Sequence, residues 1–141
     1  MPGMREQLRN NMVALISLVV ALSALGYNTW RNERTEQNRN IRAAGFELLT
    51  EIGSLQQIIF YARYAEDDQR GDSNMGWADV LTIADLAALM PVAVIRDAGE
   101  LRTAWEANSA LLAEDDAAYR RVDEAIDTLR QTTFESLRAL N

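Results

Sequence analysis

The sequence predicts an all-α protein in which a single N-terminal transmembrane helix continues into an up-down helical bundle of three or four helices. An uncharged apolar run near the N-terminus has the length of a membrane span. The residues after it repeat apolar side chains every three to four positions, and the 141 residues include only seven glycines and two prolines. Such spacing is typical of helices that bury one face.

The apolar run extends from Met12 to Tyr27 and contains two serines and no charged residue. Together with the next three residues it forms a segment, 12–30, that rises about 28 Å as a helix, close to the thickness of a bilayer core. We therefore expect a short polar tail at residues 1–11 and a transmembrane anchor at residues 12–30. Interfacial aromatic and basic side chains are expected at its end, namely Tyr27, Trp30, Arg31 and Arg34.

The same N-terminal residues also fit a cleavable signal peptide. Arg5 and Arg9 precede the apolar core, and Ala24-Leu25-Gly26 is a small-x-small cleavage site. However, the apolar run is longer than the usual core of a signal peptide, about 7–15 residues. The absence of a break after it also favours a retained anchor.

Two opposing rules bear on the orientation of the anchor. By the positive-inside rule, the arginines that follow the span favour a cytoplasmic body. A signal-anchor with a short basic tail, by default, keeps that tail in the cytoplasm. We expect the second rule to prevail, which gives a single-pass protein of the bacterial inner membrane with a periplasmic body. The arginines counted after the span are Arg31, Arg34, Arg39 and Arg42.

A stripe of small residues runs along the predicted span at spacings of three, four and three: Ala14, Ser17, Ala21 and Ala24. Small side chains let helix backbones approach closely within lipid, so this face is a candidate for pairing with another transmembrane helix. Alanine and serine are also ordinary components of a span rich in leucine and valine.

A polar neck at residues 31–40 is expected to join the anchor to a bundle domain at residues 41–141. The helix should end near Ala65, before a loop at 66–76. The bundle opens with an apolar seam of alternating four- and three-residue spacings, formed by Ile41, Gly45, Leu48, Ile52, Leu55 and Ile59. The residues expected to broaden this seam are Phe46, Leu49 and Ile58.

A second bundle helix is expected at residues 77–90, capped by Ser73 or Asn74 and buried over most of its circumference. Pro91 should end or kink it, and residues 92–96 should form a short apolar bridge.

Asp97, followed three residues later by Glu100, then predicts a capping box that opens the next helix. Residues 97–139 form either one helix of about 40 residues or two helices with a turn at the acidic triplet 114–116, and we favour the turn. The aromatic residues expected in the core are Trp77, Trp105, Tyr61, Tyr64 and Phe134.

The composition excludes several kinds of chemistry. Cysteine and histidine are both absent, so this chain by itself offers no disulfide, thiolate nucleophile, haem axial histidine or zinc site. With 14 basic and 21 acidic residues the net charge is −7, and outside the residues flanking the span there is no basic cluster to bind nucleic acid.

Acidic residues are the remaining candidates for metal binding or catalysis. The loop acids lack the alternating ligands and closing glutamate of an EF-hand, and di-iron bundles need histidine. We therefore expect no metal, no cofactor and no enzymatic activity. The groups considered are the loop residues Asp67, Asp68, Asp72 and Asn74 and the helical pairs Glu47/Glu51 and Asp123/Asp127.

The expected function is that of a non-enzymatic, membrane-anchored interaction or accessory subunit of a membrane-associated complex. Its expected partners are the lipid bilayer and other membrane protein chains or further copies of itself, and not nucleic acid. The alternative is a sensor-like, ligand-binding bundle, which resembles, in architecture alone, the four-helix input domains of bacterial chemoreceptors. With no second span before Asn141, we expect such a bundle to lack its own output domain.

Overall fold

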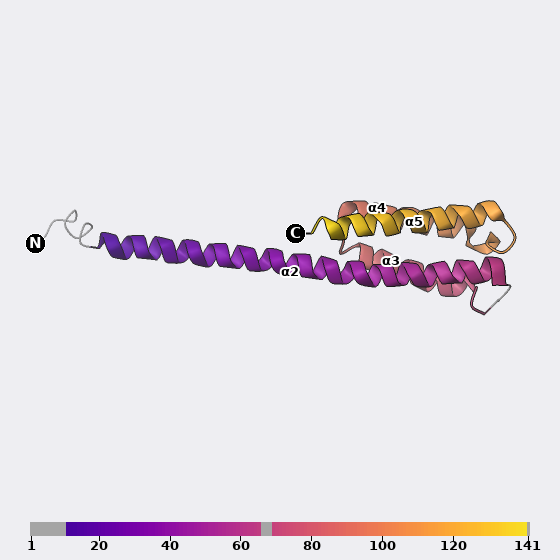
Figure 1. Ribbon diagram of the computed structural model, residues 1–141, viewed down its shortest axis with the longest axis horizontal. Helices are drawn as coiled ribbons and strands as arrows, with labels where there is room; N and C mark the ends of the chain where they lie inside the picture. Colours follow the sequence, from indigo (N-terminus) through magenta and orange to yellow (C-terminus); the bar gives the residue numbers. More distant parts are fainter. Residues whose placement is uncertain (1–10, 66–68, 141) are drawn as a thin grey trace, which may run out of the picture. The chain divides into compact units, whose positions relative to one another are not determined.

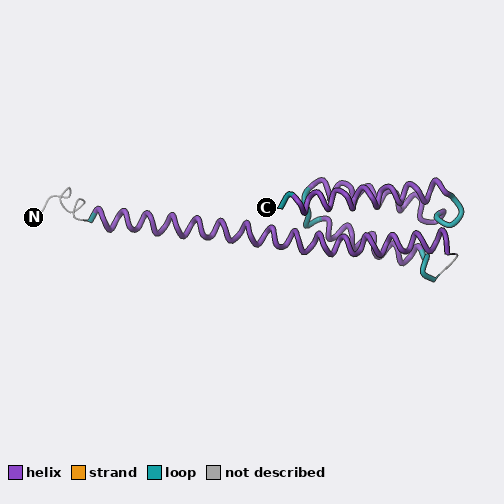
Figure 2. The backbone as a smooth tube through the Cα atoms, viewed as in Figure 1, coloured by secondary structure: helices purple, strands orange, loops and turns teal. Residues whose placement is uncertain are grey.

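The computed structural model describes residues 11–65 and 69–140, and every regular element in these ranges is a helix (Figure 1, Figure 2). The prediction of an all-helical chain is confirmed. The chain divides into two compact units, Met1–Gln37 and Asn38–Asn141, and α2 has residues in both. The elements are α2 (Met12–Phe60), the π-helical turn η1 (Tyr61–Ala65), α3 (Ser73–Ala87), α4 (Val92–Asn108), the 3-10 turn η2 (Ser109–Leu111) and α5 (Asp116–Arg138).

The second unit is a bundle of four helical segments, in which residues 38–60 of α2 pack with α3, α4 and α5. Gly45 of α2 lies against Met90, which follows α3, and against Leu137, near the end of α5. Beyond the other end of this segment, Arg63 pairs with Asp116 at the start of α5. Both α3 and α5 therefore run antiparallel to α2.

Helices α4 and α5 are also antiparallel. Thr132 near the end of α5 donates a hydrogen bond to Asp97 near the start of α4, and Arg121 near the start of α5 donates one to Asn108 at the end of α4. Because the short connection at Pro91 reverses the chain between α3 and α4, successive helices of the bundle run up and down.

One apolar core lies between the four segments. Among the predicted seam residues, Ile41 is half-buried, whereas Gly45, Leu48, Ile52, Leu55 and Ile59 are buried. Phe46, expected to broaden the seam, is exposed, because it stands about 100° round the helix from Gly45. The fully buried side chains that the other helices contribute include Val80, Ile83, Val94, Leu101, Trp105, Ile126 and Leu129.

Helix α3 begins earlier than expected and is capped by Asp72 instead of Ser73 or Asn74. The Asp72 carboxylate accepts a hydrogen bond from the backbone N–H of Asn74 at 2.8 Å, which is N-cap geometry. The expected burial over most of the circumference is also wrong, since Leu81 is exposed. A bundle helix packs against its neighbours on one side and keeps its outer side open.

Helix α4 begins at Val92, directly after Pro91, so residues 92–96 are its first turn and not a bridge. Proline suits this position because its φ, here −56°, is set for a helix start, and its carbonyl accepts the N–H of Val94 at 2.9 Å. Asp97 consequently lies inside the helix and is buried. The expected capping box of Asp97 with Glu100 is wrong.

The chain turns between α4 and α5, so residues 97–139 form two helices and not one. Asp115 is the N-cap of α5, and its carboxylate accepts a hydrogen bond from the backbone N–H of Ala117 at 2.7 Å. Leu112, which is buried, fixes the turn to the core. The preference for a turn at 114–116 is confirmed.

The expected aromatic core is partly wrong. Trp105 is fully buried and Trp77 and Tyr61 are half-buried, but Tyr64 and Phe134 are exposed. Tyr64 lies in the π-helical turn η1, which breaks the 3.6-residue period that the prediction assumed. Phe134 follows the buried Thr133 by one residue and therefore points about 100° away from the core.

The same substitution, glycine to alanine, is expected to have opposite effects on stability at two positions in the bundle. A Cβ atom at Gly76 would lie 2.2 Å from the ring of the buried Trp105, whereas one at Gly53 would meet nothing within 4 Å. Gly76→Ala should lower the free energy of unfolding by about 1–3 kcal/mol through overpacking. Gly53→Ala should raise it by up to about 1 kcal/mol, because alanine is the better helix former. Chemical denaturation measures both, and a neutral Gly76→Ala would contradict this packing.

Candidate functional site

The N-terminal part of α2 carries the clearest candidate site, an apolar surface that surrounds the helix. Its side chains are exposed all round, with Val13 at 76%. Among the residues that the structure describes, this is the one helix long and apolar enough to cross a membrane, and none of its most apolar window is buried. A signal sequence passes the same test. A core helix of a soluble protein would instead be covered by its own chain.

An aromatic and basic collar follows this apolar surface. The rings of Tyr27 and Trp30 are tilted against each other with centroids 6.1 Å apart, and the guanidinium carbon of Arg34 lies 5.2 Å from the centroid of the Trp30 ring. Arg31 is exposed beside them. Amphipathic rings and snorkelling arginines of this kind are typical of the boundary between hydrocarbon and headgroups.

The small-residue stripe of α2 is exposed over its whole length, from Ala14 through Ser17 and Ala21 to Ala24. No side chain lies within 4 Å of the position that a Cβ at Gly26 would take. Within the described residues, the stripe is therefore accessible to a second helix. Its pairing with such a helix stays a prediction.

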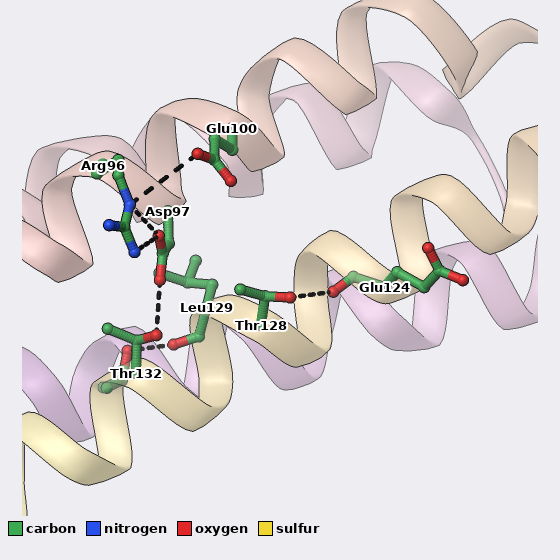
Figure 3. Close-up of polar contacts among 8 residues, drawn as sticks. Arg96, Asp97, Glu100, Glu124, Thr128, Leu129 and Thr132 are labelled. Carbon is green, nitrogen blue, oxygen red and sulfur yellow. Dashed lines mark hydrogen bonds and ion pairs between the residues drawn. The ribbon is translucent and has the colours of Figure 1, made fainter.

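The most buried charged group of the bundle is Asp97, which is 2% exposed (Figure 3). One carboxylate oxygen, Oδ1, accepts hydrogen bonds from the Arg96 guanidinium at 2.7 and 2.8 Å. The other, Oδ2, accepts one from the Thr132 hydroxyl at 2.6 Å. Figure 3 shows that these contacts link α4 to α5. A buried carboxylate needs hydrogen-bond partners, and here the Thr132 contact also holds two helices in register.

A second polar link joins the same two helices near their connection. Asn108 is buried, its amide nitrogen donates to the carbonyl of Ala104 at 2.7 Å, and its amide oxygen accepts from Arg121 at 3.2 Å. Asn108 and Asp97 thus have hydrogen-bond partners within the chain. These contacts account for both side chains as structural groups.

Glu51 of α2 is influenced by two other carboxylates, Glu47 on the same helix and Asp79 on α3. Burial raises the pKa of Glu51, and the nearby charges of Asp79 and Glu47 raise it further. Folding therefore disfavours the ionised form of Glu51 relative to the unfolded chain. No group of three acidic side chains in the described part of the chain has the arrangement needed to hold a metal ion.

The other acidic groups considered from the sequence have structural partners. Asp127 pairs with Arg130 at 2.6 Å, and Asp123 accepts a hydrogen bond from Gln56 at 3.3 Å. In the loop before α3, Asp72 serves as the N-cap. The remaining loop acids, Asp67 and Asp68, lie outside the described residues.

Comparison of the chain with protein-family models, with curated proteins and with solved structures finds no match in any of the three.

Asp97→Ala should lower the free energy of unfolding by about 1.5–3 kcal/mol, because the substitution removes hydrogen bonds to a buried charge. Asp127→Ala is the matched control, since this carboxylate also pairs with an arginine but is 62% exposed, and it should cost less than about 1 kcal/mol. Equal losses in the two variants by urea denaturation would contradict the structural role of Asp97.

Glu51→Gln should make the bundle slightly more stable at pH 7, by a few tenths of a kcal/mol, through relief of like-charge repulsion. The raised pKa of Glu51 means that the folded state of the wild type binds its proton more tightly than the unfolded state. The gain should therefore disappear as the pH falls below the ordinary glutamate range, where the wild-type carboxyl is protonated. Thermal unfolding between pH 3 and 8 measures this, and a less stable variant at pH 7 would contradict it.

Proposed function

We propose that this chain is a non-enzymatic, membrane-anchored helical subunit that acts by binding other protein chains in a membrane-associated complex. Residues 12–30 are the anchor, residues 31–40 the neck and residues 41–141 the domain that presents binding surfaces. The observation that carries the proposal is the exposed apolar surface of α2 together with the collar that follows it.

The polar chemistry of the bundle supports a binding role over catalysis. Its most buried carboxylate has an arginine and a threonine as partners, and its buried amide is bonded to a backbone carbonyl and an arginine. Acidic side chains committed to holding helices together are poor general acids or bases, because a catalytic group must be free to exchange its proton with the substrate.

We further propose that the protein lies in a bacterial inner membrane, with the bundle in the periplasm. The basis is the default orientation of an N-terminal signal-anchor with a short basic tail. A reporter fused after Asn141 tests this: a phosphatase that folds only outside the cytoplasm should be active, and a reporter that works only in the cytoplasm should be silent.

The anchor itself is tested by fractionation of the full chain. It should sediment with membranes, resist an alkaline wash and enter solution only with detergent. Leu18→Arg combined with Leu22→Arg should move much of it to the soluble fraction, because each arginine at the centre of a span costs about 2.5–3.5 kcal/mol. Gln37→Arg with Asn40→Arg adds the same charge beyond the span and should leave the chain in the membrane.

Two outcomes would overturn the proposal that residues 12–30 are a membrane anchor. One is a wild-type chain that stays in the aqueous fraction without detergent. The other is a mature chain whose mass shows cleavage after Gly26, which would identify a signal peptide.

A further inference from the structure

We propose that Arg31 and Arg34, together with Tyr27, form one face of α2 that binds the phosphate of anionic phospholipids in preference to zwitterionic ones. This inference rests on the membrane anchor proposed above and names the class of lipid that its collar selects. It is carried by the distribution of charge around α2 between residues 27 and 36.

The three side chains follow one another along a single face of the helix. Spacings of four and three residues keep them within an arc of about 60° and about 10 Å of helix axis. All three are exposed, and Tyr27 is 62% exposed. A phenol hydroxyl and two guanidinium groups therefore share one strip of surface, and each of them can donate hydrogen bonds to a phosphate oxygen.

The two arginines of this face have no carboxylate partner in the part of the chain that the structure describes. The ion pairs found there lie in the bundle. Glu33 and Glu36 are near in sequence, but they point about 160° round the helix from the two arginines. Like charges three residues apart on a helix repel each other. An anion from outside the chain would relieve this repulsion.

Helix geometry directs both arginines towards the apolar segment. Side chains of an α-helix lean towards its N-terminus, which here is the side of the predicted span. Arg34 follows this rule, because its guanidinium carbon lies 5.2 Å from the centroid of the Trp30 ring, one turn nearer the span. The contact with the ring limits the freedom of the Arg34 side chain, so that less entropy is lost when it binds an anion.

The surface next to this face suits the acyl chains of the same lipid. The residues that precede Tyr27 are apolar and exposed, with Leu22 at 59% and Leu25 at 65%. A phospholipid can cover this surface with its acyl chains while its phosphate meets the arginines. A soluble phosphate has no group that gains from burial against apolar side chains.

Charge distinguishes anionic from zwitterionic lipids at this face. In a zwitterionic headgroup a cationic amine accompanies the phosphate, whereas phosphatidylglycerol presents its phosphate without one. The bundle does not attract such a lipid, because residues 41–141 contain nine arginines and 18 acidic residues. Each arginine close to an anionic membrane surface strengthens binding by roughly fivefold. The collar is therefore the part of the chain that should select anionic lipids.

The fluorescence of Trp30 in the full chain, reconstituted into phosphatidylcholine vesicles, reports this selectivity. Trp30 is 52% exposed beside Arg34, whereas Trp105 is fully buried and Trp77 half-buried in the bundle. Lipids brominated on the acyl chain near the headgroup quench a tryptophan that they touch. Brominated phosphatidylglycerol should compete for the site roughly fivefold or more better than brominated phosphatidylcholine. Equal quenching by the two lipids would overturn the inference.

Substitutions locate the selectivity on this face. Arg31→Gln combined with Arg34→Gln should bring the preference for phosphatidylglycerol close to one. Arg102→Gln combined with Arg120→Gln is the matched control, because it removes the same charge from two exposed positions of the bundle, and it should keep the preference. An equal loss in the two double variants would overturn the inference.

The Tyr27 hydroxyl is tested separately from the charges. Tyr27→Phe removes this one donor and leaves both arginines, so it should lower the preference for phosphatidylglycerol less than the loss of the arginines does. A larger loss in Tyr27→Phe would overturn charge as the basis of the selectivity.

Salt and inorganic phosphate distinguish a lipid headgroup from a soluble anion. The preference should fall as sodium chloride is added, because the arginines are exposed and their attraction is screened. Sodium phosphate at the same ionic strength should lower it no further. A much stronger effect of phosphate than of chloride would identify a site for soluble phosphate and overturn the assignment to a lipid.

These results are separable from the test of the anchor. A chain that sediments with membranes but shows equal quenching by the two lipids keeps its anchor and loses this selectivity. A chain in the aqueous fraction, with Trp30 quenched by neither lipid, loses the anchor and the selectivity together.

Discussion

The bundle depends on the burial of one face of α2. Leu48, Ile52, Leu55 and Ile59 are fully buried there, and α3, α4 and α5 pack around them. Helices as short as α3 and α4, with 15 and 17 residues, are marginal on their own, and tertiary packing supplies most of their stability. The same helix, α2, begins with a segment whose side chains are exposed on all sides. Its two parts therefore suit two different surroundings, hydrocarbon and a protein core.

The polar groups inside the bundle show why it holds little reactive chemistry. Asp97 of α4 is bonded to Arg96 and to Thr132 of α5 (Figure 3), and Asn108 at the end of α4 is bonded to Arg121 of α5. Such groups specify which helices meet and in what register, because a shifted helix would leave them buried without partners. A bundle built in this way offers its outer faces, and not its interior, for function.

The outer faces of α2 and α4 differ in polarity. The first part of α2 is apolar all round and ends in an aromatic and basic collar, which suits a bilayer. The outer face of α4 carries exposed charges of both signs, such as Arg96 and Glu100, which suits water.

The sequence by itself determined what depends on local pattern: the all-helical class, the seam of α2 and the uncharged apolar segment, while it left open whether residues 97–139 form one helix or two. Helical spacing and N-cap residues carry these signals within a few positions. Only the tertiary structure decided where α4 starts, because Pro91 permits either a kink or a new helix and the core selected the latter. It likewise decided that Asp97 is buried. The rhythm Val94, Asp97, Leu101 and Asn108 puts Asp97 on the inner face, but only the fold brings Thr132, 35 residues away, to the carboxylate that Arg96 also contacts.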